Sequence, residues 1–178
     1  GIDIIFTREP GGTPIGERIR SIILDRDCAE MDDMTEAMLY AAARAQHVAQ
    51  VIRPALLAGK IVICDRFVDS SIAYQGYGRG LGEAVSVIND YAVCGCLPDV
   101  TFLMKMDPRV GRRRINVQQQ DRLEREKDDF HVRTYEGYLE LEKKYPGRIV
   151  GIDAARSIEE IKIDIYKKLE EVLKGVTE

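Results

Sequence analysis

The sequence has few of the residues that build metal or redox centres. It contains two histidines and four cysteines, and no two of the cysteines form a CxxC pair. A structural zinc site takes four cysteine or histidine ligands, commonly in closely spaced pairs, so we do not expect one here. Cys64 lies inside an apolar run and is expected to be a small core residue.

Long apolar runs and a surplus of basic residues are also missing. No run approaches the roughly 20 apolar residues of a membrane-spanning helix, and no signal sequence opens the chain. The net charge is −4, whereas a nucleic-acid groove normally shows a basic surplus. We therefore expect a soluble, cytoplasmic protein with no membrane or nucleic-acid partner. Its 178 residues suit a single domain, residues 1–178.

Apolar runs rich in β-branched residues alternate with helical patterns along the chain. Strands are expected at 2–7, 61–64, 100–106 and 149–152, and helices at about 15–24, 34–57, 83–96, 130–145 and from 157, with another starting at 107. This alternation is typical of an α/β fold, a parallel sheet with helices on both faces. The apolar positions expected to face inward are Met38, Ala41, Ala45, Val48, Ile52 and Leu56 in the second helix, and Ala84, Val87, Ile88, Tyr91 and Ala92 in the third.

Charged residues follow several of the predicted strands. Parallel sheets bind ligands at the carboxyl ends of their strands, and Arg8, Asp65, Arg66, Asp107 and Asp153 all lie at such ends. Their coincidence predicts a binding site along one edge of the sheet.

The stretch 61–82 carries the strongest signal of that site. Its strand ends in an aspartate and an arginine, and four alternate glycines, 76, 78, 80 and 82, close it. Between them come Asp69, Ser70, Ser71, Tyr74 and Gln75 at near-helical spacing. The alternative is a buried ion pair followed by an ordinary loop.

Two further pairs of residues are candidates for ligand contacts. Tyr40 and Arg44 stand four apart on a predicted helix, so they project from one side and could sandwich a planar ligand. The alternative is a Tyr–Arg stack on the surface. Arg8 and Arg20 are candidates for anion contacts, although each could also be a solvated surface residue.

Five segments together resemble thymidylate kinases of the bacterial type. They are FTREPGGTPIGERIR, LYAAARAQH, VICDRFVDSSIAYQGYGRGLG, DRLE and VRTYEGYLEL. The resemblance implies a P-loop nucleoside monophosphate kinase fold. It also implies transfer of a phosphoryl group from ATP to thymidine monophosphate (dTMP) with Mg²⁺, a step of dTTP biosynthesis, and a homodimer.

The resemblance also assigns roles in a base and sugar site. Tyr40 would stack on thymine and Arg44 would donate a hydrogen bond to a thymine carbonyl. Tyr74 would pack against the sugar. The remaining contacts to dTMP in this part of the site would come from Ser70, Ser71 and Gln75.

The monophosphate end would be formed by charged residues. Arg8, Glu9, Arg20 and Arg66 match family positions there, and Asp65 would act through Mg²⁺ and its waters. Arg66 and Asp65 are thus candidate catalytic residues, because phosphoryl transfer chiefly requires alignment and neutralisation of charge.

A lid is expected at about 112–127. Arg114, Arg122 and Arg125 flank a run of glutamines there and could close over ATP, with Arg114 and Arg122 as further catalytic candidates. Relatives often carry additional arginines in the lid, whereas this chain has Asn116 and three glutamines. Which arginine reaches the phosphates stays open.

One departure from the family pattern is large. No G-x₄-GK[ST] phosphate-binding loop occurs in the sequence. We expect the chain to be a truncated stretch of a longer polypeptide, inactive by itself, with an unfilled slot where a central strand belongs. The alternatives are an inactive nucleotide-binding paralogue and a kinase for another nucleoside monophosphate.

Overall fold

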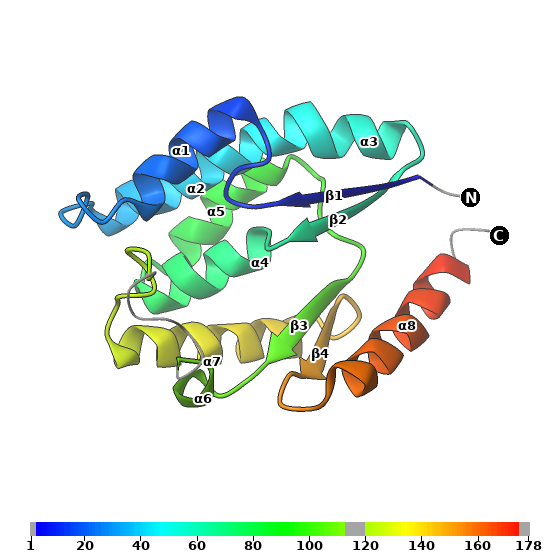
Figure 1. Cartoon of the computed structure of the whole chain (residues 1–178). Helices are drawn as coiled ribbons and strands as arrows, with labels where there is room; N and C mark the ends of the chain where they lie inside the picture. The colour runs from blue at the N-terminus through cyan, green and yellow to red at the C-terminus, as the bar shows by residue number, and fades with distance from the viewer. Residues whose placement is uncertain (1–2, 113–119, 175–178) are drawn as a thin grey trace.

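The computed structural model describes residues 3–112 and 120–174. Figure 1 shows strands alternating with helices along the chain, as the sequence predicts. The elements are β1 (Ile4–Arg8), α1 (Pro14–Leu24), α2 (Asp33–His47), η1 (Val48–Ile52), α3 (Arg53–Leu57), β2 (Ile61–Asp65), α4 (Val68–Ser71), η2 (Ile72–Gly78), α5 (Glu83–Val93), β3 (Thr101–Lys105), α6 (Pro108–Arg112), α7 (Asp128–Lys144), β4 (Ile149–Asp153) and α8 (Ile158–Lys174). The segments η1 and η2 are π-helical.

The strands form two separate parallel pairs. β1 pairs with β2, from Ile4 opposite Ile61 to Arg8 opposite Asp65. β3 pairs with β4 in the same parallel sense, and no strand among the described residues joins the two pairs. The predicted α/β class is confirmed.

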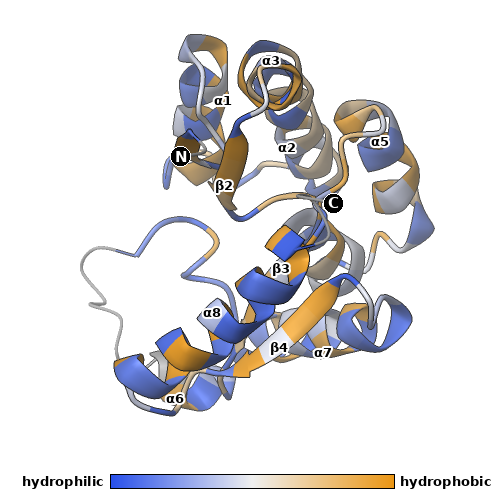
Figure 2. Ribbon diagram, turned by 90° about the vertical axis from the view of Figure 1, so that its right-hand side faces the viewer, coloured by the Kyte–Doolittle hydropathy of each residue, from blue (hydrophilic) through white to orange (hydrophobic). Residues whose placement is uncertain are grey.

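Helices flank both pairs of strands. α1, α2 and α3 lie beside β1 and β2, whereas α7 and α8 contact β4 (Figures 1 and 2). The two halves are joined by a bidentate ion pair in which Arg148, just before β4, donates to both carboxylate oxygens of Asp69 in α4 at 2.7 Å. The helical segment that follows β2 is thereby fixed to the second sheet. None of the described helices is long and apolar enough to cross a membrane.

Local sequence signals explain where several helices begin. The Thr13 hydroxyl accepts from the amide of Gly16 and caps α1, which starts with a proline. Asp32 caps α2 in the same way. Ser157 and Glu160 exchange hydrogen bonds and form a capping box before the last helix.

Two predicted helix faces are wrong in part. Met38 and Ala45 are exposed although Ala41, Val48 and Ile52 are buried, because the buried face of α2 runs through Ala37, Ala41 and Arg44 instead. Leu56 is exposed and its neighbour Ala55 is buried, after the π-helical turn η1 has changed the angular spacing of side chains.

The buried face of α5 also differs from the predicted one. Val87 and Tyr91 are exposed, whereas Val85, Asn89 and Ala92 are buried against the rest of the fold. The polar Asn89 faces inward because an arginine of α2 donates to it.

Apolar side chains of the two strand pairs and of α8 are less covered than expected. Phe6 and Ile63 are exposed on the first sheet, where exposure alternates along β1 so that one face of the strand is open to solvent. α8 carries hydrophobic residues among many charged ones (Figure 2), and none of its residues is buried.

Candidate functional site

A cavity of about 210 Å³ opens beyond the carboxyl ends of β1 and β2. Glu9 follows β1 directly and Arg66 follows β2. The predicted dTMP-site residues that line the cavity are Glu9, Arg20, Tyr40, Arg44, Arg66, Ser70, Ser71, Tyr74 and Gln75. The cavity therefore gathers side chains from the loop after β1 and from α1, α2, α4 and η2 into one place.

Arg44 of α2 is held at the floor of this cavity. Only 1% of its surface is exposed, so the alternative of a Tyr–Arg stack on the surface is wrong. One terminal nitrogen donates to Ser71 at 2.9 Å and to the amide oxygen of Asn89, and the other pairs with Glu9 at 2.7 Å. Its Nε–H has no partner among the described residues. Three neighbours thus fix the guanidinium and leave one buried donor unused.

Glu9 is held from its other side by a buried histidine. His47 donates from Nδ1 to Glu9 at 3.0 Å, and its Nε2 lies 2.7 Å from the Thr7 hydroxyl. A Cβ at Gly12, where φ is +76°, would lie 2.7 Å from the imidazole ring. The glycine in this loop therefore allows the backbone to close over His47.

Gln75 is the second buried polar side chain of the cavity. Its amide nitrogen donates to Glu36 at 2.9 Å, while its carbonyl oxygen has no partner among the described residues. Glu36 also accepts from Arg79 and Arg122. Burial raises the pKa of Glu36, but the hydrogen bonds from Arg79 and Gln75 outweigh it, so the net pKa is lowered and the carboxylate stays ionised.

Arg122, which the sequence analysis assigned to a lid over ATP, is buried in contact with Glu36 and Ile23. Its guanidinium donates to Glu36 and, from Nε, to the carbonyl oxygen of Ile23 at 2.9 Å, and only 9% of the residue is exposed. A side chain held in this way packs residues 120–127 against α1 and α2, and its contact with ATP stays a prediction. The short sequence DRLE could not reveal this because its partner, Glu36, lies 86 residues away.

Aromatic rings form one wall of the cavity. Tyr74 meets Tyr138 and Phe130 edge to face, and the Tyr138 hydroxyl donates to Ser70 at 2.8 Å. Burial raises the pKa of Tyr138 to about 12 and raises that of Tyr40 further, so both phenols stay neutral. Tyr74, which lines the cavity with Tyr40, therefore presents an uncharged aromatic ring that two further rings support from behind, and such a ring suits contact with a planar ligand.

Cations lie at the more open end of the cavity. Arg66 has a left-handed backbone, with φ at +63°, and its guanidinium lies 5.3 Å from the centre of the Tyr74 ring and donates to the Tyr74 hydroxyl at 3.3 Å. A non-glycine residue in this conformation is strained, which is common where a functional side chain must be aimed. Arg20 reaches the same end and donates to the carbonyl oxygen of Pro10 at 3.0 Å.

Arg8 is the predicted dTMP-site residue that does not line the cavity. It forms an exposed ion pair with Glu17 at 3.0 Å, and Glu17 also accepts from the amide of Gly12. The hydrogen bond from Gly12, with Arg8, lowers the pKa of Glu17 despite the small effect of burial. In this structure the Arg8 side chain fastens the loop after β1 to α1, and its role at the monophosphate stays a prediction.

Comparisons with known proteins identify the family of this chain. The family model described as thymidylate kinase matches residues 1–165. A thymidylate kinase of Halalkalibacterium halodurans is 49% identical over 177 residues, or 97% of this chain and 84% of the relative. Those of Pediococcus pentosaceus and Latilactobacillus sakei are 50% and 53% identical, over 96% and 89% of this chain and 83% and 76% of the relatives. The chain belongs to the thymidylate kinase family.

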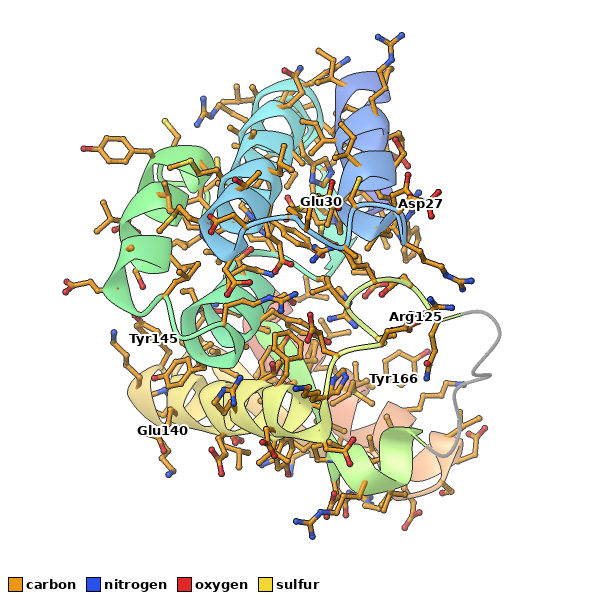
Figure 3. All side chains as sticks on the ribbon, turned by 90° about the vertical axis from the view of Figure 1, so that its left-hand side faces the viewer. Asp27, Glu30, Arg125, Glu140, Tyr145 and Tyr166 are labelled. Atoms are coloured by element: carbon orange, nitrogen blue, oxygen red, sulfur yellow. The ribbon has the colours of Figure 1, made fainter. Side chains whose placement is uncertain are left out.

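Other expectations for a thymidylate kinase concern the lid and the metal. Arg114 lies outside the described residues. Arg125 is exposed on the loop that follows the grey trace (Figure 3), and Asp65 is exposed at the end of β2. Among the residues described, no three histidine, cysteine, aspartate or glutamate side chains are grouped to hold a metal ion.

The sequence analysis missed several residues of the thymidylate kinase cavity. Its further lining residues are Pro10, Leu24, Asp121, Leu123, Glu124 and His131. Asp121 and Glu124 each accept from the other's backbone amide, at 2.9 and 3.0 Å, and so close the DRLE turn. Glu36 and Asn89, which hold cavity residues from behind, gave no signal in the sequence because their roles depend on contacts between distant helices.

Proposed function

We propose that this chain is an ATP-dependent nucleoside monophosphate kinase that phosphorylates dTMP to thymidine diphosphate. One observation carries the choice of base. Among the buried polar atoms of the cavity that have no hydrogen-bond partner in the described residues are the donor Nε–H of Arg44 and the acceptor Oε1 of Gln75. A buried polar atom left unpaired costs about 1–3 kcal/mol, so a ligand that pairs both is favoured.

Thymine offers the matching pair of groups on one edge. Its O4 carbonyl accepts and its N3–H donates, which complements one donor and one acceptor in the cavity. Cytosine has the opposite pattern, with a donating amino group at position 4 and an accepting N3. The pattern thus supports thymine or uracil and opposes cytosine, because each mismatched pair leaves buried groups unpaired.

The rest of the nucleotide would extend toward the cations. Tyr40 would stack on the base and Tyr74 would pack against the sugar. Arg66 and Arg20 would hold the phosphate at the open end of the cavity, where guanidinium groups suit phosphate geometry. Arg66 is the residue we propose as catalytic, because neutralising charge on the transferred group is the main task in phosphoryl transfer.

The described residues fit a Mg²⁺ ion that takes most of its ligands from phosphates and water. Mg²⁺ in kinases is held by one or two carboxylates together with substrate phosphates and waters, so the exposed Asp65 at the end of β2 would be its protein ligand. When bound, the ion would neutralise charge on the phosphates of ATP. Arg125 is the described lid arginine exposed enough to approach them.

We also propose a homodimer and a cytoplasmic location. α2 and α5 pack together and carry exposed apolar side chains on their outer faces, with Met38, Val87 and Tyr91 each at least half exposed. A second copy of the chain would cover this face. The four cysteines are free thiols, as is usual in a reducing compartment. Sedimentation of wild type and Tyr91→Glu tests the dimer, since only the variant should run as a monomer.

A coupled assay of the complete gene product tests the function. With ATP and Mg²⁺, we expect turnover of dTMP and dUMP and little turnover of dCMP. Absence of turnover with all three acceptors would support an inactive paralogue. A preference for dCMP would support a kinase for another nucleotide, although the relatives do not favour either alternative.

A further inference from the structure

The two ends of the Gln75 side chain have opposite hydrogen-bonding character. Its NH₂ group only donates and its carbonyl oxygen only accepts. In this structure the NH₂ end faces Glu36, at 2.9 Å, and the carbonyl oxygen at the other end has no hydrogen-bond partner among the described residues. Reversal of the amide would present a donor to the ligand, and the base pattern that the cavity accepts would change with it.

Glu36 fixes which end faces the cavity. It is completely buried and does not line the cavity itself. Three groups meet its carboxylate: the amide of Gln75 and the guanidinium groups of Arg79 and Arg122. Because an ionised carboxylate only accepts hydrogen bonds, Gln75 must turn its NH₂ end toward Glu36.

The two arginines keep Glu36 in that state. Arg79 donates to Glu36 from two nitrogens, at 2.9 and 3.3 Å, and also pairs with Glu126 and Asp33. Its guanidinium further lies 4.7 Å from the ring centre of Phe130. Such a buried charge cluster is costly to form, and a role in fixing one amide would explain its place behind the cavity.

We propose that Glu36 is a specificity-determining positioning residue, which presents the carbonyl of Gln75 to the nucleotide base and thereby favours a ring N–H at that point over a ring nitrogen that accepts. The inference rests on the proposed function for the identity of the site. It adds a residue that never touches the nucleotide but decides, through Gln75, which pyrimidine the site takes.

Glu36→Gln is the decisive variant. A glutamine at this position has nearly the same shape but can donate as well as accept, so Gln75 is free to reverse its amide. We expect the dissociation constant for dTMP to rise and that for dCMP to fall, so that the preference for dTMP drops by at least about tenfold. Isothermal titration calorimetry with dTMP, dUMP and dCMP, without ATP, measures this directly, and dUMP should follow dTMP.

Asp33→Asn is the matched control. It removes another carboxylate from Arg79, which Asp33 meets at 3.2 Å, but leaves the Glu36–Gln75 contact in place. Its preference between dTMP and dCMP should equal that of the wild type. If a folded Glu36→Gln protein keeps the wild-type preference, or if Asp33→Asn loses it equally, the proposal is overturned.

Gln75→Leu decides the matter if Glu36→Gln does not fold. Loss of the carbonyl should weaken dTMP binding and leave dCMP binding unchanged or stronger, whereas an unchanged preference would contradict a role for that oxygen. Failure of the proposed function would look different. A wild-type protein that binds neither dTMP nor dUMP removes the function itself, whereas normal wild-type binding with an unchanged Glu36→Gln preference removes only the role of Glu36.

Discussion

The two ends of the cavity are built in opposite ways. At the base end, Arg44, Gln75 and Ser71 are almost fully buried, and residues behind them hold each side chain in place. At the phosphate end, Arg66 and Asp65 are exposed at the end of a strand. The first region is a fixed pattern of donors and acceptors, whereas the second is a group of charges open to solvent.

This difference matches two different tasks. A buried polar group discriminates between ligands because a wrong partner leaves it unpaired in a medium of low dielectric constant. An exposed cation discriminates poorly, but it attracts an anion and can adjust to charge that develops during transfer. The comparison predicts that variants at the base end change the affinity for the acceptor, while variants at the phosphate end change the rate.

Arg66→Ala should have the largest effect, on the rate. We expect turnover to fall by about 10³-fold, the lower range for an arginine in phosphoryl transfer, while the free energy of unfolding changes little because the residue is exposed. Steady-state kinetics and urea denaturation measure the two effects. Unaltered turnover would remove Arg66 from the site.

Arg44→Ala should act mainly on the acceptor. We expect the KM for dTMP to rise by about 10²-fold, since a charged hydrogen-bond donor is lost, with little change in the KM for ATP. The variant should also be less stable, because Glu9 loses its buried ion-pair partner. Equal increases in both KM values would mean that the base binds elsewhere.

Arg20 and Arg8 offer a smaller and sharper comparison at the phosphate end. Arg20 lines the cavity and Arg8 does not, although both donate to the carbonyl oxygen of Pro10. We expect Arg20→Ala to raise the KM for dTMP about tenfold, and Arg8→Ala to change it less than about threefold. Similar KM values for the two variants would contradict the inference that Arg20 contacts dTMP and Arg8 does not.

The smallest effect concerns stability against acid. The pKa of Glu36 in the folded chain lies below its ordinary value of 4.5. Its ionised form therefore adds stability above about pH 4.5, and this contribution is lost as the pH falls through the lowered pKa. Urea denaturation between pH 7 and pH 3 should show a steeper acid loss in wild type than in Glu36→Gln. Parallel curves for the two proteins would exclude a lowered pKa.

Part of the site followed from sequence order alone. The positions of Arg66, Ser71 and Gln75 relative to β2 are local, because a strand, a turn and one helical segment bring them to the same edge. The spacing of Tyr40 and Arg44 is likewise a property of one helix. The partners of Arg8 and Arg122 could not be predicted, because an arginine next to a motif has several carboxylates within reach, and the folded chain pairs them with Glu17 and Glu36.

The sequence by itself determined the order of strands and helices, the strand ends at which charged residues lie, and the family. Those features depend on hydrophobic periodicity, capping residues and short motifs, which act over a few residues. The tertiary structure alone decided which charged side chains form ion pairs with one another and which remain available to a ligand. That choice depends on contacts such as Arg44 with Asn89 and Glu36 with Gln75, whose partners lie 45 and 39 residues apart and meet only when the helices pack.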